Sequence, residues 1–257
     1  MASEPHEWPQ GYGYQQPQQP VIQQQPGVPG QMSWMPAPQV PMGCPQGLEY
    51  LSAVDQILIH QQVDLVEVLT GCERTNKYRI CNTMSQQIYF ALEDTDCCTR
   101  QCCGPGRPFE MRIVDNMQRE VMHLSRPVRC QCCWWPCCLQ EIEIQAPPGT
   151  VIGYVQQKPS PWKIKLEIQD SQHQHIMTIN GPCCPCGCSD IEFPVFSADG
   201  SSEIGMITKQ WTGCTRETFT DAANFGIQFP LDLEIKFKAI LLGAVFLVDF
   251  MFFERGS

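Results

Sequence analysis

Cysteines are the side chains with the most obvious capacity for chemistry in this sequence. The chain of 257 residues contains 17 of them, and most gather in three clusters. The clusters are Cys97, Cys98, Cys102 and Cys103; Cys130, Cys132, Cys133, Cys137 and Cys138; and Cys183, Cys184, Cys186 and Cys188. Adjacent cysteines hold a metal poorly, because successive strand side chains point to opposite faces, and structural zinc favours spaced cysteine pairs. No histidine lies in the clusters, so zinc or an iron–sulfur centre is the less favoured interpretation.

The middle cluster has a surrounding typical of a membrane anchor. Trp134 and Trp135 lie inside it, and Arg126 and Arg129 precede it. Tryptophan prefers the membrane–water interface, and acyl chains on neighbouring cysteines supply the second anchor that stable attachment requires. The pattern therefore favours acylation at this cluster, while a cysteine-rich loop that simply packs stays open as the alternative.

Neither the histidines nor the sequence motifs indicate a catalytic site. The five histidines are scattered, and His173 and His175 alternate with glutamines, as on one exposed face of a strand. The sequence contains no GxSxG, P-loop or GxGxxG motif. We therefore do not expect an enzyme that makes or breaks covalent bonds.

The charge balance argues against nucleic acid as a partner. The formal net charge is −10, and such a chain repels phosphate backbones. The N-terminus has neither a basic stretch nor an apolar run of the kind found in secretory signals. We therefore expect a cytosolic or cytosol-facing protein, whose thiols stay reduced rather than forming disulfide bonds.

Residues 1–46 form a Pro/Gln-rich tail of low complexity, which we expect to be disordered. More than half of them are Pro, Gln or Gly, so the tail buries too little apolar surface to offset its ordering entropy. The spacing of Pro38 and Pro41 matches a ligand for SH3- or WW-type domains. A passive spacer is the alternative interpretation.

The chain after the tail, residues 47–257, is predicted to be one mostly β domain, folded as a barrel or sandwich. Residues 162–168 and 141–144 alternate strictly between apolar and polar side chains, which marks strands with one buried face. A weak internal repeat is also present. Phe109-x-Met111-x-Ile113-x-Asp115 is matched by Phe193-x-Val195-x-Ser197-x-Asp199, which suggests two similar β halves.

The last apolar segment has two possible interpretations. Every second residue from Phe225 to Phe237 is apolar, which predicts a long strand that bends or lies at an edge because of Pro230. The following segment, 239–253, is apolar on all sides but has only about fifteen such residues, fewer than the roughly 20 of a membrane-spanning helix. Asp249 also lies within it. Its length favours a buried central element over a membrane span.

Several long blocks of the sequence resemble the phospholipid scramblase family. They include 47–51, 59–62 and 67–71, the block Cys137-Cys138-Leu-Gln-Glu-Ile-Glu-Ile-Gln-Ala-Pro-Pro-Gly149, and the block from Phe219 to Leu233 with its continuation to Glu254. The similarity extends from Trp34 onward. It implies a tubby-like fold: a closed, internally duplicated barrel of about 12 strands around a hydrophobic C-terminal helix.

The same resemblance carries expectations about activity and location. It implies ATP-independent, calcium-stimulated, bidirectional movement of membrane phospholipids between leaflets, without bond chemistry. It implies palmitate on Cys130, Cys132, Cys133, Cys137 and Cys138. It also implies membrane association, at the cytosolic face and most typically at the plasma membrane, where the family is often described as single-pass. A scramblase with so short an apolar segment would need homo-oligomers or local thinning of the bilayer to make a hydrated path.

The family's calcium segment corresponds to residues 221–232. Compared with an EF-hand loop, it supplies side-chain oxygens only from Asp221, Asp232 and Asn224, because Ala223 occupies the third position. The remaining ligand positions fall on Phe225, Ile227 and Phe229, of which Ile227 would offer its backbone carbonyl. We therefore expect weak calcium binding, and a barrel strand with two exposed aspartates is the alternative.

Two functions remain open on the sequence alone. The first is a lipid scramblase. The second is a palmitoylated, membrane-tethered signalling adaptor that binds SH3- or WW-type partners through its Pro-rich tail.

Overall fold

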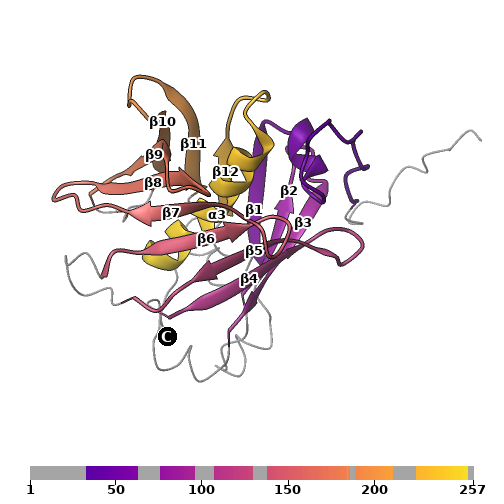
Figure 1. Ribbon diagram of the computed structural model, residues 1–257, viewed down its shortest axis with the longest axis horizontal. Helices are drawn as coiled ribbons and strands as arrows, with labels where there is room; N and C mark the ends of the chain where they lie inside the picture. The colour runs from indigo at the N-terminus through magenta and orange to yellow at the C-terminus, as the bar shows by residue number, and fades with distance from the viewer. Residues whose placement is uncertain are drawn as a thin grey trace, which may run out of the picture. The chain divides into compact units, whose positions relative to one another are not determined.

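The protein forms a closed β-barrel around a single long helix. The computed structural model describes residues 33–62, 76–95, 107–129, 138–183, 185, 189–210 and 224–253. Within these residues twelve antiparallel strands form a ring in the order β1-β12-β11-β10-β9-β8-β7-β6-β5-β4-β3-β2 (Figure 1). The expected closed barrel of about 12 strands around a C-terminal helix is confirmed.

The elements follow one another along the chain with mostly simple up-and-down connections. They are the 3-10 helix η1 (Glu49–Ala53) and then β1 (Gln56–Gln62), β2 (Lys77–Cys81), β3 (Gln87–Asp94), β4 (Phe109–Val114), β5 (Glu120–Arg126), β6 (Glu141–Gln145), β7 (Val151–Gln157), β8 (Ile164–Asp170), β9 (His175–Gly181), β10 (Ile191–Ser197), β11 (Glu203–Gln210), β12 (Asn224–Gln228) and α3 (Ile235–Phe252). The ring closes where β12 pairs with β1, with Ile227 opposite Ile57 and Phe225 opposite Ile59. Each of these strands therefore has a partner on both sides, which leaves none of them as an open edge.

The strand prediction from apolar alternation is confirmed in the two places where the pattern is strongest. In β6 the side chains of Ile142 and Ile144 are fully buried, and in β8 those of Ile164, Leu166 and Ile168 are buried, while the residues between them are partly exposed. One face of each strand therefore lines the barrel interior and the other contacts solvent.

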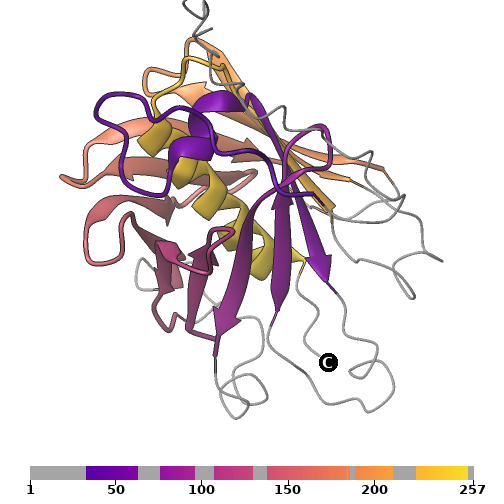
Figure 2. The ribbon, with the colours of Figure 1, turned by 90° about the vertical axis from the view of Figure 1, so that its right-hand side faces the viewer.

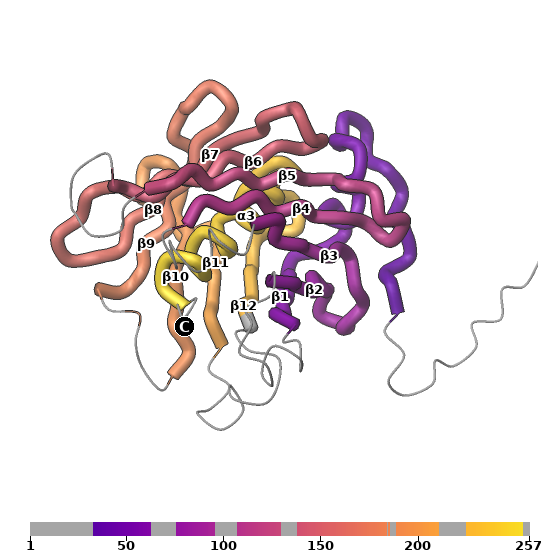
Figure 3. Tube along the Cα trace, turned by 90° about the horizontal axis from the view of Figure 1, so that it is seen from below, coloured from indigo at the N-terminus to yellow at the C-terminus, as the bar shows by residue number. Residues whose placement is uncertain are grey.

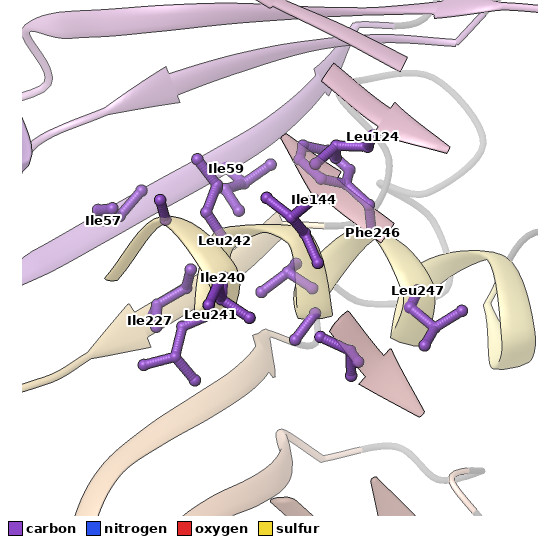
Figure 4. Packing of buried hydrophobic residues seen from close by; sticks show 14 of the residues in the cluster. Ile57, Ile59, Leu124, Ile144, Ile227, Ile240, Leu241, Leu242, Phe246 and Leu247 are labelled. Carbon is purple, nitrogen blue, oxygen red and sulfur yellow. The ribbon is translucent and has the colours of Figure 1, made fainter. Parts of the chain in front are cut away.

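The helix α3 fills the interior of the barrel, as Figures 2 and 3 show from two directions. Every residue from Lys238 to Phe250 is buried, so the helix has no solvent face along this stretch. Figure 4 shows barrel residues pointing toward the helix, among them Ile59, Leu124, Ile144 and Ile227. A helix that is apolar on all sides is expected where protein surrounds it, so the predicted burial of this segment is confirmed.

The described helices include none with the length and apolar character needed to cross a bilayer.

The predicted long strand from Phe225 to Phe237 is wrong. The strand β12 ends at Gln228, a turn follows in which the N–H of Leu233 donates to the carbonyl of Pro230, and α3 begins at Ile235. Proline has no N–H to donate to a neighbouring strand, so pairing stops there. The apolar alternation continues past Pro230 by coincidence, since Phe237 belongs to the helix.

The two copies of the sequence repeat occupy equivalent strands. Phe109 begins β4 and Asp115 follows it, whereas Phe193 lies in β10 and Asp199 follows it, six strands further along the chain. Both aspartates stabilise the next turn, because Asp115 Oδ1 accepts a hydrogen bond from the N–H of Met117 and Asp199 Oδ1 from that of Ser201. The repeat therefore corresponds to two halves of six strands.

Candidate functional site

The two ends of the barrel differ in their connections. At one end, which we call the hairpin end, short turns join successive strands, for example β2 to β3 and β4 to β5. At the other, which we call the loop end, the longer connections leave the strands that end at Gln62, Asp94, Arg126, Gln157, Gly181 and Gln210. The strands that precede the three cysteine clusters in sequence, β3, β5 and β9, end on this side, and the strands that follow the clusters, β4, β6 and β10, begin here. The described residues next to each cluster therefore lie at the loop end.

The helix α3 runs from the hairpin end to the loop end, where its last turn enters an aromatic cluster. Phe250 stacks on Phe109 with ring centroids 4.0 Å apart. Phe253, just past the helix, packs edge-on against Phe225 and Phe193. These contacts fix the C-terminus of the helix against strands from both halves of the barrel.

Two cations lie beside this helix end, the buried Arg107 and the partly exposed Lys209. Arg107 pairs with Glu93 at 2.8 Å, with 3% and 0% of their side chains exposed, and its guanidinium lies 4.9 Å from the centre of the Phe250 ring. Lys209 Nζ lies 4.7 Å from the centre of the Phe253 ring. Positive charge near the C-terminus of a helix is favourable, because the helix dipole is negative there. The cations therefore stabilise the position of the C-terminal end of α3 inside the barrel.

A second buried arginine, Arg126, lies in the neighbouring strand β5. Arg126 has 1% of its surface exposed and donates from Nε to Oε1 of Gln140 at 3.2 Å. Its guanidinium also faces the ring of Phe109. Gln140 in turn donates to the carbonyl oxygen of Cys138, at 2.9 Å. The end of the middle cysteine cluster is thus joined to the barrel by a hydrogen-bonded chain.

Asp249 is the one acidic side chain of the helix itself. It is buried, and its Oδ2 accepts a 2.8 Å hydrogen bond from the hydroxyl of Tyr78 on β2. Burial raises the pKa of Asp249 to about 6, although the hydrogen bond from Tyr78 and the charge of Lys209 act in the opposite direction. Its charge therefore changes within the range of mildly acidic pH.

A pocket of about 360 Å³ opens at the loop end, beside the last turn of α3. Its walls come from the residues before β6, the connection between β7 and β8, the start of the segment after β9, and the helix end. The lining residues are Cys138, Leu139, Gln140, Gln157, Lys158, Pro159, Ser160, Pro161, Trp162, Lys163, Ile164, Cys183, Met251 and Phe252. Cysteines from two different clusters thus line one hollow.

The structure describes only one of the five cysteines predicted to carry palmitate. Cys138 has 7% of its surface exposed. The others, Cys130, Cys132, Cys133 and Cys137, lie outside the described residues. Acylation of this cluster therefore stays a prediction.

The predicted calcium ligands are spread over three environments. The side chains of Phe225, Ile227 and Phe229 are buried in the core, whereas Asp232 is exposed at the hairpin end, beyond β12. Asn224 begins β12 opposite His60 and Gln210, and Asp221 lies outside the described residues. Among the residues that the structure describes, no group of three or more His, Cys, Asp or Glu could hold a metal ion. Calcium binding stays a prediction.

The predicted SH3-type ligand lies in the segment before η1. Pro41 is exposed and Pro38 is partly exposed. The start of this segment is fixed to the barrel, because the N–H of Met35 donates to the carbonyl of Gln87 and the N–H of Gln87 to the carbonyl of Ser33. Binding of an SH3- or WW-type domain to this segment stays a prediction.

Sequence reasoning missed the buried ion pair and the pocket. Glu93 and Arg107 lie in separate parts of the chain that meet only in the barrel, and Lys158 and Trp162 meet Met251 only because α3 ends beside their loop. The one usable signal was the pair of lysines around the Pro-rich stretch 159–161.

Comparison with known proteins gives one consistent result. The model of the Scramblase family matches residues 35–255. Phospholipid scramblase 1 of Mus musculus is 60% identical over 231 residues, which cover 90% of this chain and 70% of the relative. Phospholipid scramblase 2 of Bos taurus is 60% identical over 235 residues, covering 90% and 80%. Phospholipid scramblase family member 5 of Homo sapiens is 48% identical over 235 residues, covering 89% and 87%.

Among solved structures, one of a protein from Arabidopsis thaliana aligns with 76% of this chain and 93% of its own, with a TM-score of 0.39 and 8% identity. The family match spans most of the chain, and the relatives named above share about half of their aligned residues or more with it. By these matches, the chain belongs to the scramblase family.

Proposed function

We propose that this protein moves phospholipids in both directions between the leaflets of a membrane, without ATP and with stimulation by calcium. The observation that carries the proposal is the 60% identity to proteins named phospholipid scramblase over 90% of the chain. No covalent bond is made or broken in such movement, so the protein is not an enzyme in that sense.

The packed interior limits the route that a lipid can take. Every side chain from Lys238 to Phe250 is buried, so in the part of the barrel that the structure describes the helix has no side open to a polar headgroup. Moving a headgroup across hydrocarbon requires a hydrated path or a thinned bilayer. The lipid therefore passes along the outside of the protein, and several copies, or the loop end pressed into one leaflet, would provide the thinning.

The loop end is the part of the surface that we propose faces the membrane. Trp162 and Val128 are exposed there, at 77% and 67%. The hairpin end also exposes apolar side chains, among them Leu231, but Trp162 is a tryptophan, the residue that prefers the membrane interface. In the sequence the middle cysteine cluster lies between β5, which ends on this side, and β6, which begins here. Palmitate on the cluster would hold this end against the cytosolic leaflet, for which we propose the plasma membrane.

Passive movement agrees with the sequence. It contains no P-loop motif for a nucleotide phosphate. Calcium stimulation is the finer part of the proposal, and Asp221 and Asp232 are the side chains that would respond, since they are the acidic residues at the ends of the segment.

The test is reconstitution of the full chain in vesicles with a fluorescent phospholipid in both leaflets. A reductant that cannot cross the membrane bleaches only the outer leaflet unless lipids exchange. We expect bleaching beyond the outer-leaflet fraction, without ATP and faster with calcium. Bleaching that stops at that fraction, in vesicles shown to contain protein, overturns the proposal.

The calcium component is tested separately with two variants. Asp232→Ala should reduce the calcium stimulation, whereas Asp199→Ala, an exposed aspartate of a β-turn at the hairpin end, should leave it unchanged. An equal response in both variants removes Asp232 from the mechanism.

A further inference from the structure

The pocket beside the end of α3 has the size of a ligand site. Its volume is about 360 Å³, within the usual range of roughly 300–1,000 Å³ for small-molecule pockets. The wall is built from the connection between β7 and β8, which includes Trp162, and from Met251 and Phe252 of the helix. The floor is fixed, because Gln140 donates its backbone N–H to Oε1 of Gln157 at 3.0 Å.

The charge of the pocket is opposite to that of the protein. Two of its lining residues are lysines, Lys158 and Lys163, and none is Asp or Glu, although the chain has a formal net charge of −10. Lys158 Nζ lies 3.1 Å from Glu167 Oε2, on the outer face of β8. Lys163 is exposed and has no ion-pair partner among the described residues. Glu167 balances the charge of Lys158, so the charge of Lys163 is the one that attracts an anion to the rim.

The same pocket also presents apolar surface. Trp162 is 77% exposed, next in sequence to Lys163, and Met251 and Phe252 are only partly buried. Tryptophan beside lysine is the combination found at the level of lipid headgroups. A soluble anion such as phosphate would use Lys163 alone, whereas an amphipathic anion uses both surfaces.

We propose that this pocket binds one anionic phospholipid of the membrane surface. Lys163 contacts the phosphate, and Trp162, Met251 and Phe252 contact the glycerol and the first part of an acyl chain. A whole phospholipid is larger than the pocket, so most of its chains remain in the bilayer. The inference rests on the proposed function, since it locates where the protein holds one of the lipids that it moves.

The first experiment measures binding to the full chain by titration calorimetry. The probes are phosphatidylserine with short acyl chains below its micelle concentration, glycerophosphoserine without chains, and inorganic phosphate. We expect the short-chain lipid to bind and the two chain-free anions to bind at least about tenfold more weakly, a difference of about 1.4 kcal/mol. Equal binding of all three probes overturns the proposal in favour of a plain anion site.

The variants locate the site. Lys163→Gln and Trp162→Ala remove exposed side chains, so the fold should be retained, and each should weaken binding of the short-chain lipid about tenfold. The matched controls are Lys236→Gln and Leu231→Ala, which remove an exposed lysine and an exposed apolar side chain at the hairpin end. Equal affinity in pocket and control variants overturns the proposed site.

The same variants in the vesicle assay separate this inference from the proposed function. A wild-type chain that binds the short-chain lipid at this pocket but does not exchange lipids between leaflets supports the pocket and overturns the function. A chain that exchanges lipids while its pocket variants bind the short-chain lipid normally overturns the pocket and leaves the function standing.

Discussion

The hydroxyl of Tyr78 donates a 2.8 Å hydrogen bond to Oδ2 of Asp249, and so joins the barrel wall to the helix inside it. The two residues are 171 positions apart in the chain. Burial raises the pKa of Asp249 to about 6, whereas the pKa of an aspartate in an unfolded chain is about 3.9. Between these values the folded protein binds the proton more tightly than the unfolded chain. The stability that this provides is complete below the unfolded pKa and is lost as the pH rises through 6.

Replacing Asp249 with Asn should therefore change how stability depends on pH. At about pH 7.5 the variant should be more stable than the wild type, because it does not bury a charge. Its advantage should shrink by roughly 1 to 1.5 kcal/mol on going to about pH 5, where Asp249 is mostly protonated. Urea unfolding followed by tryptophan fluorescence at each pH measures this difference.

Tyr78→Phe is the control for that prediction. It removes the hydrogen bond that lowers the pKa of Asp249, so the pH range over which stability falls should move to higher pH. Wild-type and Asp249→Asn stabilities that run parallel from pH 5 to pH 7.5 would show that Asp249 does not titrate in this range.

Lys238→Met should destabilise the protein by at least about 3 kcal/mol. The side chain of Lys238 is fully buried, and its Nζ donates to the carbonyl oxygens of Leu51, Val54 and Leu231 at 3.0, 2.9 and 2.8 Å. Methionine has a similar size but no donor. The contacts with Leu51 and Val54 are buried, and each of these two carbonyls that loses its partner costs about 1 to 3 kcal/mol, to which the partly buried contact with Leu231 adds a smaller amount. Chemical unfolding gives the free energy directly.

Lys236→Met is the matched control, because Lys236 lies two positions earlier in the same helix and is exposed. Its effect should stay within about 0.5 kcal/mol. A similar small effect of both substitutions would mean that the three carbonyl contacts of Lys238 contribute little.

Gly153→Ala should destabilise the barrel by about 1 to 3 kcal/mol, as overpacking of a core does. A Cβ atom at Gly153 would clash with the carbonyl oxygen of Gln169 and lie 2.5 Å from Cδ1 of Ile240 on the helix. The backbone oxygen cannot move without disturbing the pairing of β7 with β8. Thermal unfolding should show a lower melting temperature.

Gly226→Ala provides the comparison on another strand. The nearest atom to a Cβ there is Cδ2 of Leu58, at 3.8 Å, which is an ordinary contact. This variant should therefore melt close to the wild type, and equal losses in the two variants would contradict the steric explanation.

Replacing Cys130, Cys132, Cys133 and Cys137 together with Ser should release the protein from membranes in cell fractionation and abolish acyl exchange on these positions. Cys138→Ser alone should have little effect, because this thiol is buried and poorly reachable by an acyl donor. Unchanged membrane association and acyl content in the fourfold variant would exclude the cluster as the anchor.

Much of the barrel could be predicted from local patterns, because side-chain alternation directly reflects which face of a strand is buried. Residues 141–144 and 164–168 show this clearly. The burial of the last segment followed from its length. The start of α3 could not be predicted, since the apolar alternation continues through Pro230 and only the three-dimensional packing shows where the strand ends.

The site was harder to predict, because its parts are distant in sequence. Lys238 directly precedes the apolar segment 239–253 in the sequence, yet it is buried, and two of its partners lie more than 180 residues away. That the strand ends flanking all three cysteine clusters lie at one end of the barrel depends on the direction in which each strand runs. Strand direction is a property of the folded barrel, so local sequence patterns do not reveal it.

The position of α3 in the chain also has a consequence for synthesis. The segment that fills the barrel comes after all twelve described strands, and the strand that closes the ring, β12, comes just before it. A chain emerging from the ribosome therefore makes its strands before it has anything to wrap them around. The apolar faces of these strands stay uncovered until the helix has been synthesised. During that interval we expect chaperones to protect the nascent chain from aggregation.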